Sequence, residues 1–395
     1  MVPPKKIWIN TGEASGDMHG AELLRALREC GPPLRFMGMG GPLMRAEAGF
    51  TPLFRTEDLS VMGITEVVAH LPRIVSLLRG IKAALRRERP DAVIVIDAPS
   101  FHFRVIKAAR ALGIPVYYYI SPKIWAWKEY RGWFIKENVR KLYCILPFEV
   151  DFYKRFGMDV EYVGNPLVDI IAGQMPDGIQ TCPGLIGLLP GSRKREISAL
   201  LPQFAQSAGI LAQHMPSLRF ACGRAPGVSE EYLRNYWKSD VPVVFAPPEE
   251  RYVLMRQSEM LIAASGTVTL EAALIGTPAL VTYKVSRLSY AVGRALVHVP
   301  YVSLPNLILG KELYPELLQG KCDAAPLAAA ALNWLRPPEG ANPLHTIRRE
   351  LAAFRGTMGE PGAAGRAVLS ILSDLHTQQC QVVQEGQPGM CCERF

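Results

Sequence analysis

Short runs of hydrophobic residues alternate along the chain with longer segments in which hydrophobic residues recur about every three or four positions. The short runs are typical of strands buried on both faces, and the longer segments are typical of helices that cover such strands. The alternation favours an α/β fold with parallel sheets. The predicted strands are 7–9, 34–36, 92–96, 116–119 and 142–146, and then 185–189, 218–221, 241–245, 260–264 and 279–283.

The repeat of this pattern predicts two Rossmann-like domains that face a cleft. A chain of 395 residues is too long for one ordinary core and suits two. The turn residues at 163–166, or the stretch at 174–184 that contains proline and glycine, mark the change-over. We expect domains at 1–165 and 166–343, terminal helices at 344–376 that cross back or exchange with a partner chain, and a disordered tail at 377–395.

Composition narrows the class of protein. No uninterrupted apolar run reaches the roughly 18 residues of a membrane span, and the first residues lack the apolar region of a signal peptide, so we expect a cytoplasmic protein. The eight cysteines form no C-x-x-C pair, which indicates reduced thiols. The net charge of +8 favours nucleic acid, an anionic membrane face or phosphorylated substrates, and does not choose among them.

A turn rich in small residues, Asn10–Asp17, follows the first predicted strand and precedes a helix. Small residues allow a ligand to approach the backbone and the amides at the start of a helix. The same turn is also compatible with ordinary capping by Ser15 or Asp17. The common nucleotide fingerprints do not fit, because Leu43 stands where G-x-G-x-x-G needs its last glycine, and no P-loop motif occurs.

Two turns in the second half suit a diphosphate. Pro190–Glu196 offers free backbone amides, a hydroxyl and three cations at the start of a helix. Ser265–Glu271 places two hydroxyl residues around a glycine at another helix start, and its glutamate lies about a turn and a half further on, within reach of a ribose. Ordinary capping and a solvated glutamate are the alternative for either turn.

A carboxylate at a strand end is the candidate for proton transfer. Asp97 follows the strand 92–96 directly and could act as the general base for a substrate hydroxyl, with a turn cap as the alternative. His19 and His102 are weaker candidates, because a lone histidine is usually a packing or surface residue.

Taken together, these motifs resemble the lipid-A-disaccharide synthase family, which are inverting glycosyltransferases of the two-Rossmann GT-B architecture. The resemblance covers about residues 7–320. The stretches that carry it are TGEASGD (11–17), FMGMGG (36–41), VMGITEV (61–67), IDAPSF (96–101), YYISPKIWAW (118–127), LPFE (146–149), LLPGSRKREI (188–197), ASGTVTLEAAL (264–274), SLPNLILG (303–310) and PELLQ (315–319).

The resemblance implies a reaction and assigns residues to it. UDP-2,3-diacylglucosamine would condense with 2,3-diacylglucosamine 1-phosphate, lipid X, to give the β-1,6-linked disaccharide 1-phosphate and UDP. Asp97 would take the proton of the acceptor hydroxyl, and Arg193 would neutralise the leaving diphosphate. The other implied catalytic residues are Glu13 and Ser15, and the implied substrate- and UDP-binding residues are Gly12, Gly16, Asp17, Gly191, Ser192, Ser265, Gly266, Thr267, Glu271, Asn306 and Gln319.

Two departures from the family pattern affect the proton pathway. The family often reads D-A-P-D-F-N where this chain has Ser100 and His102, and it often has histidine where Asn165 stands. Asp97 would therefore act alone or with His102. We expect no metal and no cofactor, because no D-x-D motif or carboxylate pair with metal-ligand spacing accompanies these motifs.

Acylated substrates would bring the chain to the inner face of the cytoplasmic membrane. Between 73 and 89 six basic residues accompany a single acid, which suits an anionic leaflet, although a helix packed on its own sheet has a similar apolar stripe. A separate group of aromatic residues could line the acyl or sugar pocket. Alternatively, these residues could belong to the core. The stripe comprises Ile64, Val67, Val68, Leu71, Ile74, Leu78, Ile81 and Leu85, and the aromatic cluster Trp125, Trp127, Tyr130 and Trp133.

Other functions are kept as alternatives. A UDP-sugar epimerase of similar fold would need no lipid-facing helix, and a non-catalytic nucleotide-binding protein at the membrane surface would tolerate the loss of Asp97. The sequence shows no base-stacking or groove-reading motif for nucleic acid. It leaves open whether the chain forms a homodimer.

Overall fold

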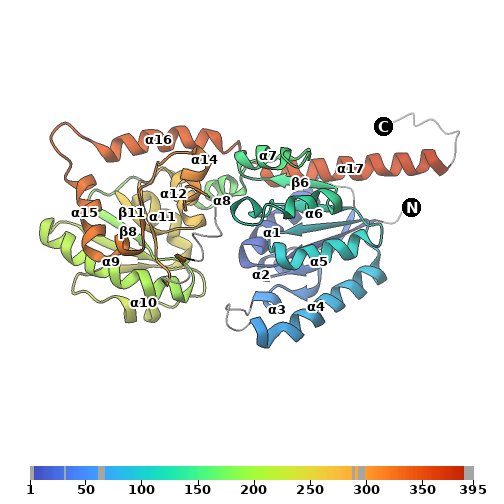
Figure 1. Ribbon diagram of the computed structural model, residues 1–395, viewed down its shortest axis with the longest axis horizontal. Helices are drawn as coiled ribbons and strands as arrows, with labels where there is room; N and C mark the ends of the chain where they lie inside the picture. Colours follow the sequence, from blue (N-terminus) through green and yellow to red (C-terminus); the bar gives the residue numbers. More distant parts are fainter. Residues whose placement is uncertain (1–3, 31–32, 61–66, 287–289, 292–298, 387–395) are drawn as a thin grey trace. The chain divides into compact units, whose positions relative to one another are not determined.

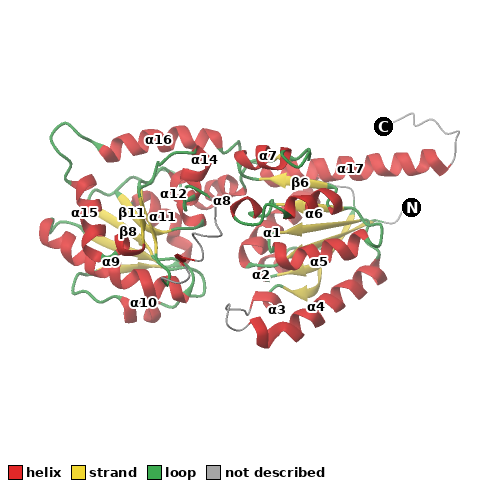
Figure 2. Cartoon of the chain, viewed as in Figure 1, coloured by secondary structure: helices red, strands yellow, loops and turns green. Residues whose placement is uncertain are grey.

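Two parallel sheets, each covered by helices, make up the chain (Figures 1 and 2). The computed structural model describes residues 4–30, 33–60, 67–286, 290–291 and 299–386. It divides into two compact units, the first comprising Met1–Pro166 with Pro361–Phe395 and the second Leu167–Glu360. The predicted α/β class with two Rossmann-like units is confirmed.

The first unit contains a seven-stranded sheet in the order β3-β2-β1-β4-β5-β6-β7. The strand order reverses between β1 and β4, which is where parallel sheets bind ligands. Thr11 at the end of β1 is in register with Ile96 at the end of β4, so the loops that follow both strands start side by side. The strands are β1 Lys5–Thr11, β2 Leu34–Gly40, β3 Phe50–Arg55, β4 Ala92–Ile96, β5 Val116–Tyr119, β6 Lys141–Cys144 and β7 Glu161–Tyr162.

Helices cover both faces of this sheet. Helices α1 and α17 pack against each other and bury the face that carries Ile7 and Ile9, while α4 and α5 pack together on the opposite face (Figure 1). The helices are α1 Ala14–Cys30, α2 Pro42–Ala46, α3 Glu57–Ser60, α4 Val67–Glu88, α5 Pro99–Arg110, α6 Arg131–Asn138, α7 Pro147–Lys154 and α17 Ala363–Gly386, with a 3-10 turn η1 at Ile124–Ala126.

The second unit repeats the topology with six strands in the order β10-β9-β8-β11-β12-β13, so its reversal lies between β8 and β11. The strands are β8 Leu185–Leu189, β9 Arg219–Gly223, β10 Val243–Ala246, β11 Met260–Ala264, β12 Ala279–Tyr283 and β13 Glu316–Leu318. The helices are α8 Pro166–Gln174, α9 Lys194–His214, α10 Glu230–Tyr236, α11 Arg251–Gln257, α12 Thr267–Ile275, α14 Leu304–Leu309, α15 Ala324–Leu335 and α16 Pro343–Thr357, with turns η2 Pro248–Glu250 and η3 Gln319–Cys322.

Two helices extend past points where local sequence signals suggest an end. Helix α4 runs through Pro72, although proline is more common in the first turn of a helix. The proline lies near the helix start, where its ring removes one backbone hydrogen bond without ending the helix. The tail predicted to be disordered from Thr377 is helical as far as Gly386, because α17 continues that far, and residues 387–395 lie outside the described part.

Polar contacts fix α17 to the first sheet. Asp374 accepts hydrogen bonds from the Tyr117 hydroxyl at 2.7 Å and from the Arg140 guanidinium at 3.0 and 3.1 Å. Ser370 donates to Glu161 at 2.7 Å. Burial alone would raise the pKa of Asp374, but the bonds from Arg140 and Tyr117 lower it below its usual value. The ionised carboxylate is thus the form that holds the helix.

We expect Asp374→Asn to lower the free energy of unfolding by about 1–2 kcal/mol at pH 7, since hydrogen bonds to a charged group are lost. Because the folded pKa is depressed, this stabilisation exists above the unfolded pKa of about 3.9 and disappears as the pH falls through the folded value. The melting temperatures of the variant and the wild type should therefore become equal at acidic pH. Asp151→Asn, which removes an exposed pair with Lys154, is the control and should leave stability unchanged.

Candidate active site

The turn after β4 holds Asp97 in a strained conformation. Asp97 has φ +60° and Ala98 has φ +42°, so two successive residues other than glycine are left-handed. Such strain persists only where surrounding contacts enforce it, and it is common at functional sites. One contact comes from Gly12, where an added Cβ would lie 2.1 Å from the Cβ of Ala98. Glycine at position 12 therefore lets the loop after β1 close on this turn.

The start of α1 places a hydroxyl on the Asp97 carboxylate. The Ser15 hydroxyl donates to Asp97 Oδ2 at 3.2 Å, and Ser15 is exposed while Asp97 is half-buried. Gly16 is buried against Ile96, and Glu13 is exposed at the same loop. The structure thus brings Gly12, Glu13, Ser15, Gly16 and Asp97 together, and the carboxylate stays open to a substrate hydroxyl.

Asp17 has an internal position in the first unit. Its buried carboxylate accepts backbone N–H groups from Gly41 at 2.7 Å, Leu43 at 2.9 Å and Met44 at 3.1 Å, all at the start of α2. Negative charge at a helix N-terminus is stabilising. Asp17, predicted as a substrate contact, therefore fixes α2 to α1 in this structure.

His102 supports the backbone of Asp97 and does not touch its carboxylate. The Trp8 indole can only donate, and it does so to Asn10 Oδ1 at 3.2 Å, which fixes the orientation of the Asn10 amide. The amide nitrogen of Asn10 therefore faces His102 Nε2 at 3.0 Å and donates to it. His102 Nδ1 then carries the proton and donates to the carbonyl of Asp97. Burial lowers the pKa of His102 to about 4, so the ring is neutral near pH 7 and both nitrogens are engaged. These contacts favour Asp97 acting without His102.

Two further groups near Asp97 are uncharged at neutral pH. The Tyr118 hydroxyl donates to the Asp97 carbonyl at 3.0 Å, and burial raises the pKa of Tyr118 well above its usual value. Burial lowers the pKa of His19 to about 4, although the nearby charge of Asp97 opposes this shift. Asn10 begins the predicted turn at 10–17 and Tyr118 lies in the predicted strand 116–119, but neither was predicted to contact the Asp97 turn.

The two predicted phosphate turns start from adjacent strands of the second unit. Leu189 in β8 pairs with Ala263 in β11, so the loops at their carboxyl ends are neighbours at the reversal point. Gly191 is left-handed, with φ +103°, and Ser192 and Arg193 are exposed. Arg193 pairs with Glu196 at 2.9 Å at the N-terminus of α9, with 79% of its side chain exposed.

The start of α12 presents exposed backbone beside a buried acid. Gly266 and Thr267 are exposed at the N-terminus of the helix, where amides have no partner within the helix. Ser265 donates its hydroxyl to the carbonyl of Val302 at 2.7 Å, so that side chain is already engaged. Glu271 lies on the same helix with 5% of its surface exposed.

Asn306 and Gln319 are engaged inside the second unit. The buried Asn306 amide accepts the N–H groups of Leu313 and Tyr314, both at 2.9 Å, and donates to the Tyr314 carbonyl at 2.8 Å. Gln319 accepts from the N–H of Val285 at 2.9 Å and donates to its carbonyl at 3.2 Å. Their contacts position loops, and the predicted contact with substrate stays a prediction.

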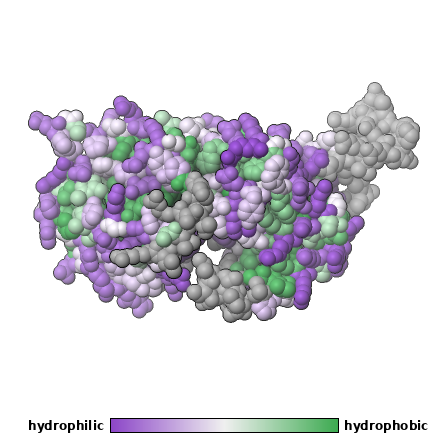
Figure 3. Space-filling view, viewed as in Figure 1, coloured by the Kyte–Doolittle hydropathy of each residue, from purple (hydrophilic) through white to green (hydrophobic). Residues whose placement is uncertain are grey.

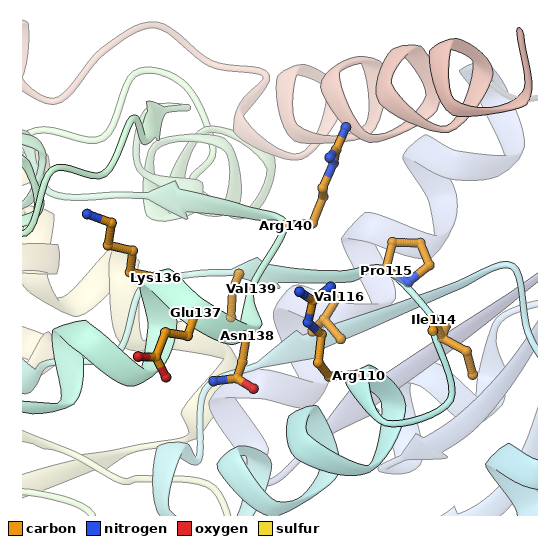
Figure 4. Close-up of a pocket in the computed structure, with 10 residues that line it drawn as sticks. Arg110, Ile114, Pro115, Val116, Lys136, Glu137, Asn138, Val139 and Arg140 are labelled. Atoms are coloured by element: carbon orange, nitrogen blue, oxygen red, sulfur yellow. The ribbon is translucent and has the colours of Figure 1, made fainter. Parts of the chain in front are cut away.

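A depression of about 380 Å³ lies elsewhere, at the amino end of β5 (Figure 4). Arg110 and Asn138 line it, and the Arg140 side chain points away towards α17. This depression lies at the opposite end of the strands from Asp97, which follows the carboxyl end of β4. Within the described residues, no three His, Cys, Asp or Glu side chains gather as metal ligands.

Two Rossmann-like units in one chain, each a parallel sheet covered by helices, are the arrangement of the GT-B fold. The chain is similar to a UDP-GlcNAc 2-epimerase from Neisseria meningitidis bound to UDP-GlcNAc, with a TM-score of 0.62, 15% identity, and 94% of this chain and 100% of that one covered. It is equally similar to CalG4, the calicheamicin glycosyltransferase, with a TM-score of 0.62, 15% identity, and 95% and 100% covered. At such identity the similarity concerns the fold.

Sequence comparisons identify the family within this class. The family model described as lipid-A-disaccharide synthetase matches residues 7–348. The lipid-A-disaccharide synthase of Myxococcus xanthus is 40% identical over 381 residues, which are 94% of this chain and 98% of the relative. That of Syntrophus aciditrophicus is 37% identical over 384 residues, 95% and 99% of the two chains. The chain belongs to the lipid-A-disaccharide synthase family.

The close approach at Gly12 gives a testable prediction. Gly12→Ala should lower the free energy of unfolding by about 1–3 kcal/mol, because its methyl group overlaps Ala98. Gly16→Ala is the matched control, since its methyl group would lie 3.4 Å from the nearest atoms and alanine favours the helix. Thermal denaturation of both variants measures the difference. Equal melting temperatures would show that Gly12 is not needed for this contact.

Proposed function

We propose that the chain transfers 2,3-diacylglucosamine from UDP to the 6-hydroxyl of 2,3-diacylglucosamine 1-phosphate and releases UDP. The observation that carries this proposal is the carboxylate of Asp97, which is held by Ser15 at the reversal point of the first sheet in a member of this family. A general base for a sugar hydroxyl needs a carboxylate of this kind, accessible and held in place.

Asp97 acts on the acceptor. Its carboxylate removes the proton of the 6-hydroxyl as the oxygen attacks the anomeric carbon of the donor from the face opposite UDP. The bond from that carbon to the UDP oxygen breaks, and the α-linked donor becomes a β-linked product in one displacement. His102 keeps the Asp97 backbone in place through its carbonyl.

The second unit acts on the leaving group. As the bond to UDP breaks, negative charge grows on the diphosphate. The exposed guanidinium of Arg193 and the amides at the start of α12 are suited to neutralise this charge without a metal. Gly191, Ser192, Ser265, Gly266 and Thr267 form the two turns that would receive the phosphates, and Glu271 would hold the ribose.

The decisive assay uses purified protein in detergent with UDP-2,3-diacylglucosamine and 2,3-diacylglucosamine 1-phosphate. Disaccharide and UDP should form in equal amounts. Because the fold is also that of UDP-GlcNAc 2-epimerases, the products should be examined for an epimerised sugar nucleotide. Folded protein that yields no disaccharide, or that yields an epimer without releasing UDP, would refute the transferase.

Two substitutions separate the roles of the units. Asp97→Asn should lower kcat by about 100- to 10,000-fold while UDP still binds, because only the proton acceptor is lost. Arg193→Ala should lower the rate by about 100- to 1,000-fold and weaken UDP binding, because a cation near the diphosphate is lost. Rates and UDP titrations measure both. Weaker UDP binding in the Asp97 variant alone would reverse the assignment.

We also propose that the protein works at the cytoplasmic face of the membrane. In the part of the chain that the structure describes, no helix has the length and apolar character to cross a bilayer. Leu78, Ile81 and Leu85 of the predicted apolar stripe are buried in the first unit, and Ile74 is half-buried. Ile64 and the side chains of Val67, Val68 and Leu71 lie outside the described part. The outward face of α4 is basic at Arg79, Lys82 and Arg86.

Aromatic side chains at and before α6 supply the apolar contact with the membrane. Trp125 is buried and donates to Glu149 at 3.1 Å, but Trp127, Tyr130 and Trp133 are 52%, 69% and 54% exposed. Lys128 lies 3.7 Å from the Trp127 ring centre. Exposed aromatic and basic residues together suit a lipid headgroup region. The face in Figure 3 also carries hydrophobic residues over α3 and α4 beside hydrophilic ones.

This surface predicts a loss of vesicle binding on substitution. Trp127→Ser combined with Trp133→Ser should reduce cosedimentation with anionic vesicles by about tenfold or more, because two interfacial aromatic groups are lost. Val244→Ser, at an exposed apolar residue of the second unit, is the control. Catalysis with short-chain substrates in detergent should change little. Equal vesicle binding by both variants would contradict a role for these tryptophans.

A further inference from the structure

A charged cluster of the buried Glu271 and Tyr252 with the half-buried Arg251 joins α11 to α12 in the second unit. Glu271 Oε1 accepts the Tyr252 hydroxyl at 3.2 Å and lies 3.1 Å from Arg251 Nη2. The same guanidinium nitrogen donates to the Tyr252 oxygen at 2.7 Å, and the guanidinium also lies over the Tyr252 ring, 4.5 Å from its centre. Two residues at the start of α11 therefore hold one oxygen of one carboxylate.

The cluster leaves a donor and an acceptor unused. Glu271 Oε2 has no partner among the described residues, and the Nε–H of Arg251 is buried without one among them. A buried polar group is nearly always paired, and an unpaired one costs stability, so the Nε–H of Arg251 calls for an explanation. A ligand that offers both a hydroxyl and an oxygen acceptor would satisfy them together.

The position of the cluster indicates the ligand. Glu271 lies about one turn along α12 from the exposed Gly266 and Thr267, where the proposed function places the diphosphate. A nucleoside attached to that diphosphate offers ribose hydroxyls as donors and ribose or base oxygens as acceptors. Neither a free phosphate nor a second diphosphate offers a hydroxyl of this kind.

Arg251 also determines the charge of Glu271. Burial raises the pKa of Glu271, and the positive charge of Arg251 is the main opposing influence, followed by the hydrogen bond from Tyr252. Removing the guanidinium therefore leaves a buried carboxyl that takes up a proton more readily as the pH falls. A protonated carboxyl is a poorer acceptor for a ribose hydroxyl than a carboxylate.

We propose that Arg251 is a nucleoside-recognition residue of the donor site: it fixes Oε1 of Glu271, leaves Oε2 for the ribose, and gives its own Nε–H to an oxygen of the nucleoside. This assignment rests on the proposed function, because that function supplies the UDP group.

Titration of wild-type protein with UDP by calorimetry, between pH 5.5 and 8.5, tests the proposal. Arg251→Gln should bind UDP about tenfold more weakly at pH 7.5, and the loss should grow as the pH falls. Arg251→Lys keeps the charge but cannot supply the second N–H group. It should bind about threefold more weakly with a pH dependence like that of the wild type. Arg256→Gln, on the same helix, is the matched control and should bind as the wild type does.

The outcomes are distinguishable. If Arg251→Gln binds UDP as tightly as the wild type at every pH, the role of Arg251 is refuted while the proposed function stands. If the wild type binds no UDP, the donor half of the proposed function fails as well. If Arg251→Gln does not fold, Arg251→Lys decides, because wild-type affinity in that variant would refute the contact through Nε–H.

Discussion

The approach of the first helix to the turn after β4 is the contact on which the acceptor site depends. Strands β1 and β4 are neighbours, so the loops that follow them lie close together at the end of the sheet. Glycine at position 12 allows this close approach, because a side chain there would overlap Ala98. The turn then takes left-handed backbone at Asp97 and Ala98, and Ser15 reaches the carboxylate. A strained turn and a small residue opposite it are therefore two parts of one arrangement.

The sequence was sufficient for the fold class and for the strand ends at which the candidate site residues lie. Strands in the middle of each sheet are continuous apolar runs, and motifs at their carboxyl ends are placed by topology alone. The edge strands β3, β7 and β13 were not predicted, and their sequences explain this. Strand β3 contains Pro52, which is tolerated at an edge, while β7 and β13 are only two and three residues long.

The roles of individual site residues were less predictable than their place. Asp17, Asn306 and Gln319 lie in the stretches from which the resemblance was predicted, yet their polar atoms are used by backbone groups of their own unit. A motif records that a residue type is needed and does not say whether it touches substrate or holds a loop. The support given by Arg251 to Glu271 was equally hidden, because the two residues belong to different helices and no sequence spacing links them.

The two key carboxylates have opposite environments, and this difference matches the chemistry proposed for each. Asp97 is half-buried with a hydroxyl as partner, so a substrate proton can reach it and leave it again. Glu271 is buried, which raises its pKa, and the positive charge of Arg251 beside it opposes this rise, so the carboxylate form that binding needs depends on the arginine. Environment thus separates two similar side chains into a proton acceptor and a ligand-binding group. The neutral state of His19 and His102 supports the same division, because neither ring adds a positive charge that would compete with the substrate hydroxyl for Asp97.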